Sequence, residues 1–379
     1  MSLNRPSPRR PVVPPLSSGT QFPIMAANDR RIGPDLQHLA EFAFATAPVV
    51  GTASNALPER AVSSDRARTL LVVDAACDMP SKWLDDNNIA VLPIKAVVDD
   101  WELLDTHNEF DAMEFFRKDL AARGARASTT PLSPVETRDF IQSNLTADTD
   151  FVLQVTIAAG RSKIYMNSLA AMQSLTAAHN RVRRGMGNRS PFKTWVVDSE
   201  TGFTGQGVMV YEANRQLTNG VSAPDVAGRM EQLRHQVHTF MVPKDLFYLY
   251  KRAREKGDDS LSWISYNVAR ALDIKPIIHA HGGVTEPVLK VRGHFEALER
   301  VLTMAMDHVR RGLSAPVVCA SYAGNLEDIR TTTAFRNLRD ACQWHNVELT
   351  LSTMSMTGGL HVGVDAFAIA FACKELDLS

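Results

Sequence analysis

Four short segments of the sequence combine acidic, hydroxyl or cationic side chains with small residues, at points where a predicted strand ends or a helix begins. In an open parallel sheet, ligands bind beyond the carboxyl ends of the strands. Side chains of these types can hold an anion, cradle a phosphate or supply a nucleophile. The candidate segments are Asp74–Asp78, Ser128–Ser133, Ala158–Ser162 and Asp198–Gly207.

The third segment allows two kinds of chemistry. Gly160-x-Ser162 lies between a predicted strand and a helix, as in the nucleophile elbow of hydrolases, but Ile164 stands where a second glycine is needed. The alternative is that Ser162 caps a helix N-terminus, which attracts anions through its free N–H groups and dipole. Arg161 and Lys163 add positive charge. An anionic head group is therefore expected to bind here.

The fourth segment is rich in glycine, with Gly202, Gly205 and Gly207 between a predicted strand and a helix. A phosphate cradle is one interpretation, but the spacing matches neither GxGxxG nor a Walker motif, and no lysine follows. Close packing of the helix against the strand is the favoured interpretation.

His279 and His281 fall on one face of a predicted strand and could pair as metal ligands. A metal site needs three or four ligands, and no further ligand lies near these two in the sequence. The sequence therefore predicts no metal and no cofactor.

Composition narrows the class of protein. A chain of 379 residues is long for one core, so two domains and an additional segment are expected. The 41 Lys and Arg nearly balance the 42 Asp and Glu, which argues against a nucleic-acid partner. The four cysteines are far apart and lack zinc spacing, so they are expected to be buried reduced thiols.

Two features bear on location. No uncharged apolar run reaches the roughly 18 residues that a membrane-spanning helix requires. The basic start of the chain is interrupted by prolines where a secretory signal needs its apolar segment. The sequence therefore predicts a cytoplasmic protein without a transmembrane segment.

The pattern divides the chain into three parts. Residues 1–67 are rich in Pro, Ser and Arg and predict a flexible extension, in which the short apolar pattern at 36–44 could contact a membrane or partner. In residues 68–220 strands and helices alternate, which predicts an α/β domain with a parallel sheet. The strands are expected at Thr69–Asp74, Val91–Val98, Phe151–Ile157 and Trp195–Asp198, and the helices at Phe110–Ala122, Pro134–Leu145, Ile164–Arg181 and Gly205–Leu217.

Residues 221–379 predict a mixed α+β domain. A hairpin is expected around His281-Gly282-Gly283, with strands at Val317–Tyr322, Val347–Ser352 and Ala366–Phe371. The helices are expected at Pro224–His238, Lys244–Lys256, Ser262–Leu272, Phe295–Arg311 and Leu326–His345.

Several motifs follow one another in a fixed order. The chain reads D-A-A-C-D-M-P at 74–80, T-T-P-L-S-P at 129–134 and A-A-G-R-S-K-I-Y at 158–165. It continues with D-S at 198–199, I-K-P-I at 274–277, V-R-G at 291–293 and G-L-H-V-G-V-D-A-F-A-I-A-F at 359–371. In order and spacing, from about residue 69 to the C-terminal end, these motifs resemble those of the DegV family of bacterial fatty-acid-binding proteins.

The resemblance implies a two-domain fold that buries one acyl chain between the domains and holds its carboxylate with hydroxyls and a histidine. Carried over position by position, the carboxylate-binding residues are Thr129, Thr130, Ser162 and His361. The family's G-G-R, associated with phosphoryl transfer to the bound fatty acid by a partner kinase, keeps only its arginine here, as Arg254. We therefore expect a long-chain fatty-acid binder without catalysis of its own, with a fatty acid kinase as a partner.

Two alternatives remain open at this point. In a serine hydrolase acting on acyl esters, Ser162 would be the nucleophile and His361 its base, with an acid such as Asp307 to orient the histidine. In a regulatory protein the pocket would be vestigial. Two serines of the family motif are Ala158 and Ala159 here, which keeps that second alternative open.

Overall fold

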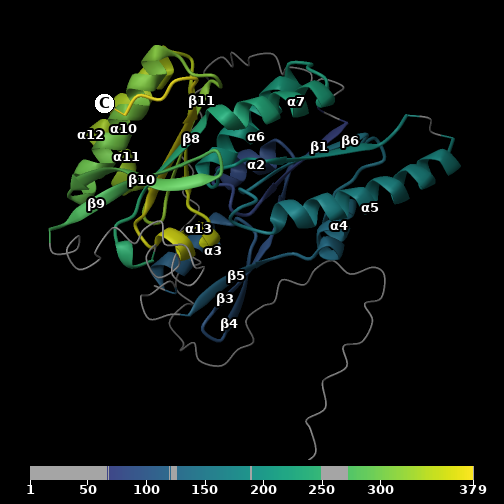
Figure 1. Ribbon diagram of the computed structural model, residues 1–379, viewed down its shortest axis with the longest axis horizontal. Helices are drawn as coiled ribbons and strands as arrows, with labels where there is room; N and C mark the ends of the chain where they lie inside the picture. Colours follow the sequence, from purple (N-terminus) through teal and green to yellow (C-terminus); the bar gives the residue numbers. More distant parts are fainter. Residues whose placement is uncertain are drawn as a thin grey trace, which may run out of the picture. The chain divides into compact units, whose positions relative to one another are not determined.

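The computed structural model describes residues 66, 68–118, 120, 126–187, 190–248 and 272–378. These residues form three β-sheets with helices packed on them (Figure 1), and they all belong to one unit of the chain, residues 60–379. The predicted fold class, a parallel sheet covered by helices followed by a mixed α+β part, is confirmed. The predicted boundaries at 67/68 and 220/221 stay predictions.

The first sheet is fully parallel and has the strand order β2-β1-β6-β7. Every residue of β6 is buried, as expected for a parallel strand covered on both faces. Alternate side chains along β1 enter two different core clusters, because successive residues of a strand point to opposite faces. The strands are β1 (Thr69–Asp74), β2 (Ile89–Leu92), β6 (Phe151–Thr156) and β7 (Lys193–Asp198).

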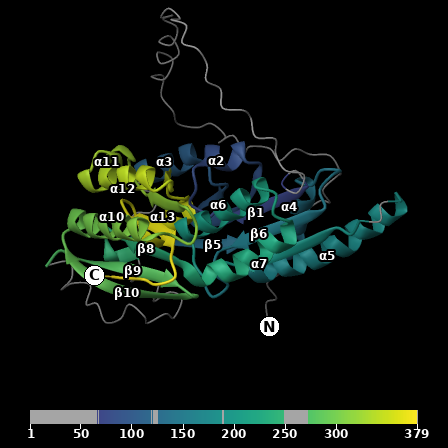
Figure 2. The ribbon, with the colours of Figure 1, turned by 90° about the horizontal axis from the view of Figure 1, so that it is seen from above.

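Helices cover both faces of this sheet (Figure 1), and Figure 2 shows the same elements from above. On one face, α4 contacts β2 and α5 contacts β7, and on the other face α6 and α7 pack. A capping box between Ser133 and Glu136, with Pro134 in the first turn, fixes the start of α4. The helices are α2 (Ser81–Asp86), α4 (Pro134–Ser143), α5 (Ile164–Gly185), α6 (Thr204–Thr218) and α7 (Ala223–Leu233).

Helix α6 is buried nearly all round because it contacts strands of two sheets. A Cβ at Gly205 would lie 2.3 Å from Oγ1 of Thr239 on β8, and one at Gly207 would lie 2.9 Å from the sulfur of Met79. The glycines of this segment thus permit close helix packing, which supports the favoured interpretation over a phosphate cradle.

The second sheet is mixed and has the order β10-β9-β8-β13-β11-β12. One face packs on α10 and α12, and part of the other face packs on α6. The strands are β8 (Val237–Val242), β9 (Ile274–His281), β10 (Val284–Arg292), β11 (Val317–Tyr322), β12 (Glu348–Thr353) and β13 (Phe367–Ala372). The helices are α10 (His294–Arg311), α11 (Glu327–Arg330), α12 (Thr333–Trp344) and α13 (Met356–Val362).

A third, small antiparallel sheet with the order β4-β3-β5 was not predicted. Its strands are β3 (Ile94–Val98), β4 (Trp101–Asp105) and β5 (Ala127–Pro131), and helix α3 (Glu109–Arg117) follows β4. The predicted strand Val91–Val98 is wrong, because Pro93 lies between β2 and β3, which belong to different sheets. The segment Ser128–Ser133 is also not a post-strand loop, since its first part is β5.

Other boundaries need correction. The predicted helix Pro224–His238 ends at Leu233, and a short 3₁₀ turn (Arg234–Gln236) leads into β8, which was missed. The predicted helix Leu326–His345 is two helices, α11 and α12. Helix α13 was missed as well. The expected helices at 244–256 and 262–272 lie almost wholly outside the described residues.

Two expectations from composition can be compared with the structure. All four cysteines are buried and free, as predicted. In the parts of the chain that the structure describes, no helix combines the length and apolar character needed to cross a membrane.

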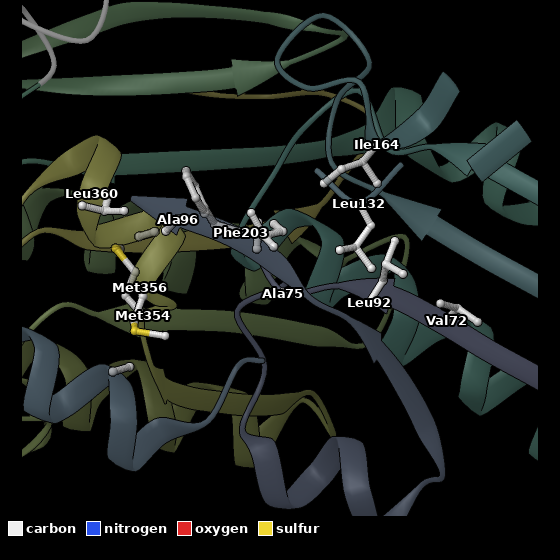
Figure 3. Packing of buried hydrophobic residues seen from close by; sticks show 14 of the residues in the cluster. Val72, Ala75, Leu92, Ala96, Leu132, Ile164, Phe203, Met354, Met356 and Leu360 are labelled. Carbon is white, nitrogen blue, oxygen red and sulfur yellow. The ribbon is translucent and has the colours of Figure 1, made fainter. Parts of the chain in front are cut away.

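The largest apolar cluster joins elements from distant parts of the chain. It includes residues from β1, α3, α5 and α13, and Figure 3 shows Val72, Ile164 and Leu360 among its members. A Cβ at Gly359 would lie 2.1 Å from Phe116, so α13 packs against α3 at a distance that only glycine allows. This packing brings the C-terminal motif beside the first half of the chain.

Candidate functional site

A cavity of about 630 Å³ lies where the carboxyl ends of β1, β6 and β7 meet β5, α13 and one face of β8, β9 and β10. Its size falls within the range of ordinary small-molecule sites, roughly 300 to 1,000 Å³. Residues from both predicted domains contribute to its walls. Its polar side chains are Thr129, Thr130, Arg161, Ser162, Lys163, Glu200, Thr201, Thr239, Thr285, Thr357 and His361.

The remaining walls are apolar. Both aliphatic and aromatic side chains contribute, and most of them come from strands or from the residues that directly follow strands. The apolar members are Ala76, Ile94, Pro131, Ile157, Ala158, Ala159, Ile164, Met166, Phe203, Met241, Ile278, Ala280 and Val362. A ligand with a long apolar part and one polar end matches this division.

The four residues predicted to bind a carboxylate all line this one cavity. The hydroxyl of Thr129 lies 3.4 Å from Nε2 of His361, although 232 positions separate the two residues in the chain. A hydroxyl beside an imidazole nitrogen can present two donors to one oxyanion. The structure therefore brings together the residues that the motifs suggested, and their role in binding is taken up below.

The sequence suggested that Ser162 caps a helix, but the structure shows that it is not the N-cap of α5. Ser162 lies one residue before that N-cap. The N-cap is Lys163, whose side chain makes no capping bond. The Ser162 hydroxyl instead accepts a hydrogen bond of 3.3 Å from the Ile164 N–H, so it still occupies the first turn. Ser162, Lys163 and Ile164 of this turn all line the cavity. An anion in the cavity would meet the positive end of the α5 dipole.

Thr129 and Thr130 differ in direction because neighbouring residues of a strand point to opposite faces. Thr129 pairs with buried Ala96 on β3, whereas Thr130 pairs with exposed Lys95. Thr129 is accordingly half-buried and Thr130 is exposed. Of the two threonines, Thr129 is the one beside His361.

The position of His361 depends on two buried acids that sequence reasoning did not assign. Asp78 accepts hydrogen bonds from the Ser355 N–H, at 3.0 Å, and from the Ser321 hydroxyl, at 2.6 Å. Asp105 accepts a 2.7 Å bond from the N–H of Thr357. These bonds fix the N-terminal turn of α13, the helix that carries His361. The Asp-x-x-x-Asp spacing at 74–78 was noted, but no sequence signal pointed to the partners.

Burial raises the pKa of the Asp78 carboxyl, while nearby His107 and the hydrogen bonds from Ser321 and Ser355 oppose that rise. His107 is held between two backbone carbonyls, those of Ala75 and Met79. The segment after β1 thus supports α13 through Asp78, and its Ala76 also lines the cavity.

Asp74, the last residue of β1, also holds part of the site in place through buried hydrogen bonds. Its carboxylate accepts hydrogen bonds from the N–H groups of Ile157 and Ala76 and from the amide of Gln206. Complete burial raises its pKa to about 6, against the lowering effect of those bonds. Because Ile157 begins the segment that leads to Ser162, Asp74 ties the cavity wall after β6 to the end of β1.

The hydrolase alternative finds little support in this geometry. Asp307 forms an ion pair with Arg310 on an exposed part of α10. It is not one of the described residues that line the cavity. Arg254, the predicted phosphoryl-transfer arginine, lies outside the described residues.

Comparison with known proteins identifies the family. Residues 68–374 match the family model described as "Uncharacterised protein, DegV family". The chain is 38% identical over 309 residues to a DegV domain-containing protein of Xanthomonas campestris pv. campestris, covering 82% of this chain and 98% of that protein.

Solved structures show the same fold. A DegV lipid-binding protein from Thermotoga maritima superposes with a TM-score of 0.64 at 19% identity, covering 82% of this chain and 100% of that one. DegV from Bacillus subtilis, described as a fatty acid binding protein, gives 0.63 at 19% identity, with coverage of 81% and 99%. A family protein from Eubacterium eligens, loaded with heptadecanoic acid, gives 0.59 at 17% identity, with 81% and 100% covered. The match over most of its length shows that this chain belongs to the DegV family.

Proposed function

We propose that this protein binds one long-chain fatty acid in the cavity and performs no chemistry on it by itself. The observation that carries the proposal is the juxtaposition of Thr129 and His361 at the wall of a largely apolar cavity that Ser162 also lines. The fatty acids described for relatives from Bacillus subtilis and Eubacterium eligens support it. An open cavity of about 630 Å³ also argues against a vestigial pocket filled by side chains.

Burial of the acyl tail supplies the affinity in this proposal. Each buried methylene contributes about 0.8 kcal/mol, so about fourteen methylenes contribute roughly 11 kcal/mol before the costs of association. Apolar side chains such as Ile157, Phe203 and Met241 provide the surface. The tail is therefore expected to determine how tightly the ligand binds.

The head group determines which ligand binds. A carboxylate that leaves water without hydrogen-bond partners would cancel much of the gain from the tail. Thr129, Ser162 and His361, which we call the polar clamp, supply donors, and Arg161 and Lys163 are exposed cations on the same wall. A fatty acid should therefore bind more tightly than the fatty alcohol of equal length.

The test uses the purified full chain. Mass spectrometry of an organic extract should find about one long-chain fatty acid per protein, and after lipid removal, calorimetry should show tighter binding of palmitate than of hexadecanol. A clean extract from several expression hosts, or equal affinity for acid and alcohol, would contradict the proposal. Labelling of Ser162 by a fluorophosphonate would favour the hydrolase instead.

The second part of the proposal is that a fatty acid kinase phosphorylates the bound carboxylate, in the cytoplasm, with Arg254 taking part. Support comes only from the family motif, of which the arginine is kept and the glycines are not. Arg254→Ala should leave palmitate affinity unchanged and abolish acyl-phosphate formation in a reconstituted kinase assay. An equal loss of binding would show that Arg254 acts on the cavity itself.

A further inference from the structure

Three histidines gather on the face of the second sheet that is opposite the cavity. His279 and His281 are two residues apart on β9 and therefore share a face, and His238 lies on the neighbouring strand β8. The register pairs Phe240 with His279, which places His238 opposite His281. One ring nitrogen from each histidine lies within 4.8 Å of the other two.

Backbone contacts orient two of the three rings. Nδ1 of His281 lies 2.8 Å from the carbonyl oxygen of Val237, so it carries the proton and Nε2 carries the lone pair. His238 has a hydrogen bond to the backbone of Cys373, and its Nδ1 lies 3.0 Å from Nε2 of His279. Metal-binding histidines commonly have one nitrogen anchored in this way to a carbonyl.

The cluster lies among buried side chains, and His238 itself is buried. The aromatic rings of Phe240 and Phe371 pack beside the cluster. His308 packs on Phe371, but both of its nitrogens already have partners, so it is not a fourth ligand.

We propose that His238, His279 and His281 form a binding site for one divalent first-row transition ion, with Zn²⁺ as the best match. Imidazole suits Zn²⁺, and three histidines with one open position form a known zinc ligand set. Zn–N bonds of about 2.0 Å place the donor atoms of a tetrahedral site about 3.3 Å apart. The ring nitrogens of the three histidines lie within 4.8 Å of one another, so the rings must move closer together when the ion binds. Glu286, directly across from His279 on β10, or a water molecule completes the set.

This site is separate from the cavity although it shares the same strands. Thr239, next to His238, and Ala280, between His279 and His281, point to the other face and line the cavity. A bound ion would crosslink β8 and β9 and stabilise the wall behind the ligand. The inference does not rest on the proposed fatty-acid binding, and its test uses a different readout.

The experiment titrates the untagged, chelator-treated full chain with Co²⁺ and then Zn²⁺. We expect one equivalent of Co²⁺ to produce the strong visible absorption of a tetrahedral site, and Zn²⁺ to displace it and raise the melting temperature. Loss of an outer contact weakens metal sites by about 10- to 100-fold, so loss of a ligand in His281→Ala or His279→Ala should weaken binding by at least about 100-fold. His345→Ala, at an exposed position, is the matched control and should bind normally.

Circular dichroism establishes that each variant is folded, and the two variants are independent of each other. Absence of a saturable Co²⁺ spectrum in the wild type would overturn the proposal, whatever the variants do. Wild-type affinity in both His279→Ala and His281→Ala would overturn it too, since the ion would then be bound elsewhere.

Discussion

Replacement of Thr129 by valine is the sharpest test of the polar clamp. Valine keeps the shape of threonine and removes only the hydroxyl that lies 3.4 Å from Nε2 of His361. A hydrogen bond to a charged group is worth roughly 1.5 to 3 kcal/mol, and Thr129 is only half-buried, so the lower end applies. Because 1.4 kcal/mol corresponds to a factor of ten, the Kd for palmitate should rise about 10-fold.

Calorimetry on lipid-free protein measures this change, and hexadecanol provides the internal reference. The alcohol fills the same apolar walls but carries no charge, so its affinity should change much less than that of palmitate. Thr130→Val is the matched variant, since it makes the same substitution one residue along β5, where the side chain shares a face with exposed Lys95. A loss in Thr130→Val as large as in Thr129→Val, or a change below 2-fold in Thr129→Val, would refute the assignment.

Three further predictions follow from the site. Ser162→Ala should weaken palmitate binding by about 1 to 3 kcal/mol without altering the circular dichroism spectrum, and unchanged affinity would remove Ser162 from the clamp. Asp74 has a folded pKa of about 6 against an ordinary value of 3.8, so it contributes up to about 3 kcal/mol of stability below pH 4, which is lost as the pH rises through 6. Urea unfolding of Asp74→Asn should lack this loss, and an unchanged pH profile would show that Asp74 does not titrate in this range. Asp78→Asn should lower stability by about 1 to 3 kcal/mol and reduce the preference for palmitate over hexadecanol, whereas Ser321→Ala, which leaves the bond to Ser355 in place, should keep that preference.

Patterns within short stretches of the sequence correctly predicted several strands and helices. Strand β1 and strand β11 have the predicted bounds, because short apolar runs between polar residues mark buried strands. Helix α5 begins at the predicted residue and extends four residues beyond the predicted end, since nothing in the sequence breaks it there. The four carboxylate-site candidates came from motif order rather than from periodicity, and the fold brings all four to one cavity.

The missed elements have non-local causes. Strand β8 is buried on both faces, and its apolar run gave no alternation; its first two residues, Val237 and His238, were assigned to the preceding helix and the other four to no element. That error also concealed His238 as a partner for His279 and His281. Helix α13 contains two adjacent glycines, which disfavour a helix in isolation, and it forms because buried acids hold its first turn.

The polar clamp takes its residues from both halves of the chain. Thr129 and Ser162 come from the first half, whereas His361 comes from a short helix in the second half that would have little stability alone. Asp78 and Asp105 connect these halves through backbone N–H groups, so the His361 side of the clamp is complete only when the two halves are docked. A fatty acid that contacts both sides would bind the docked form alone, and would therefore stabilise the contact between the halves by the free energy of its own binding.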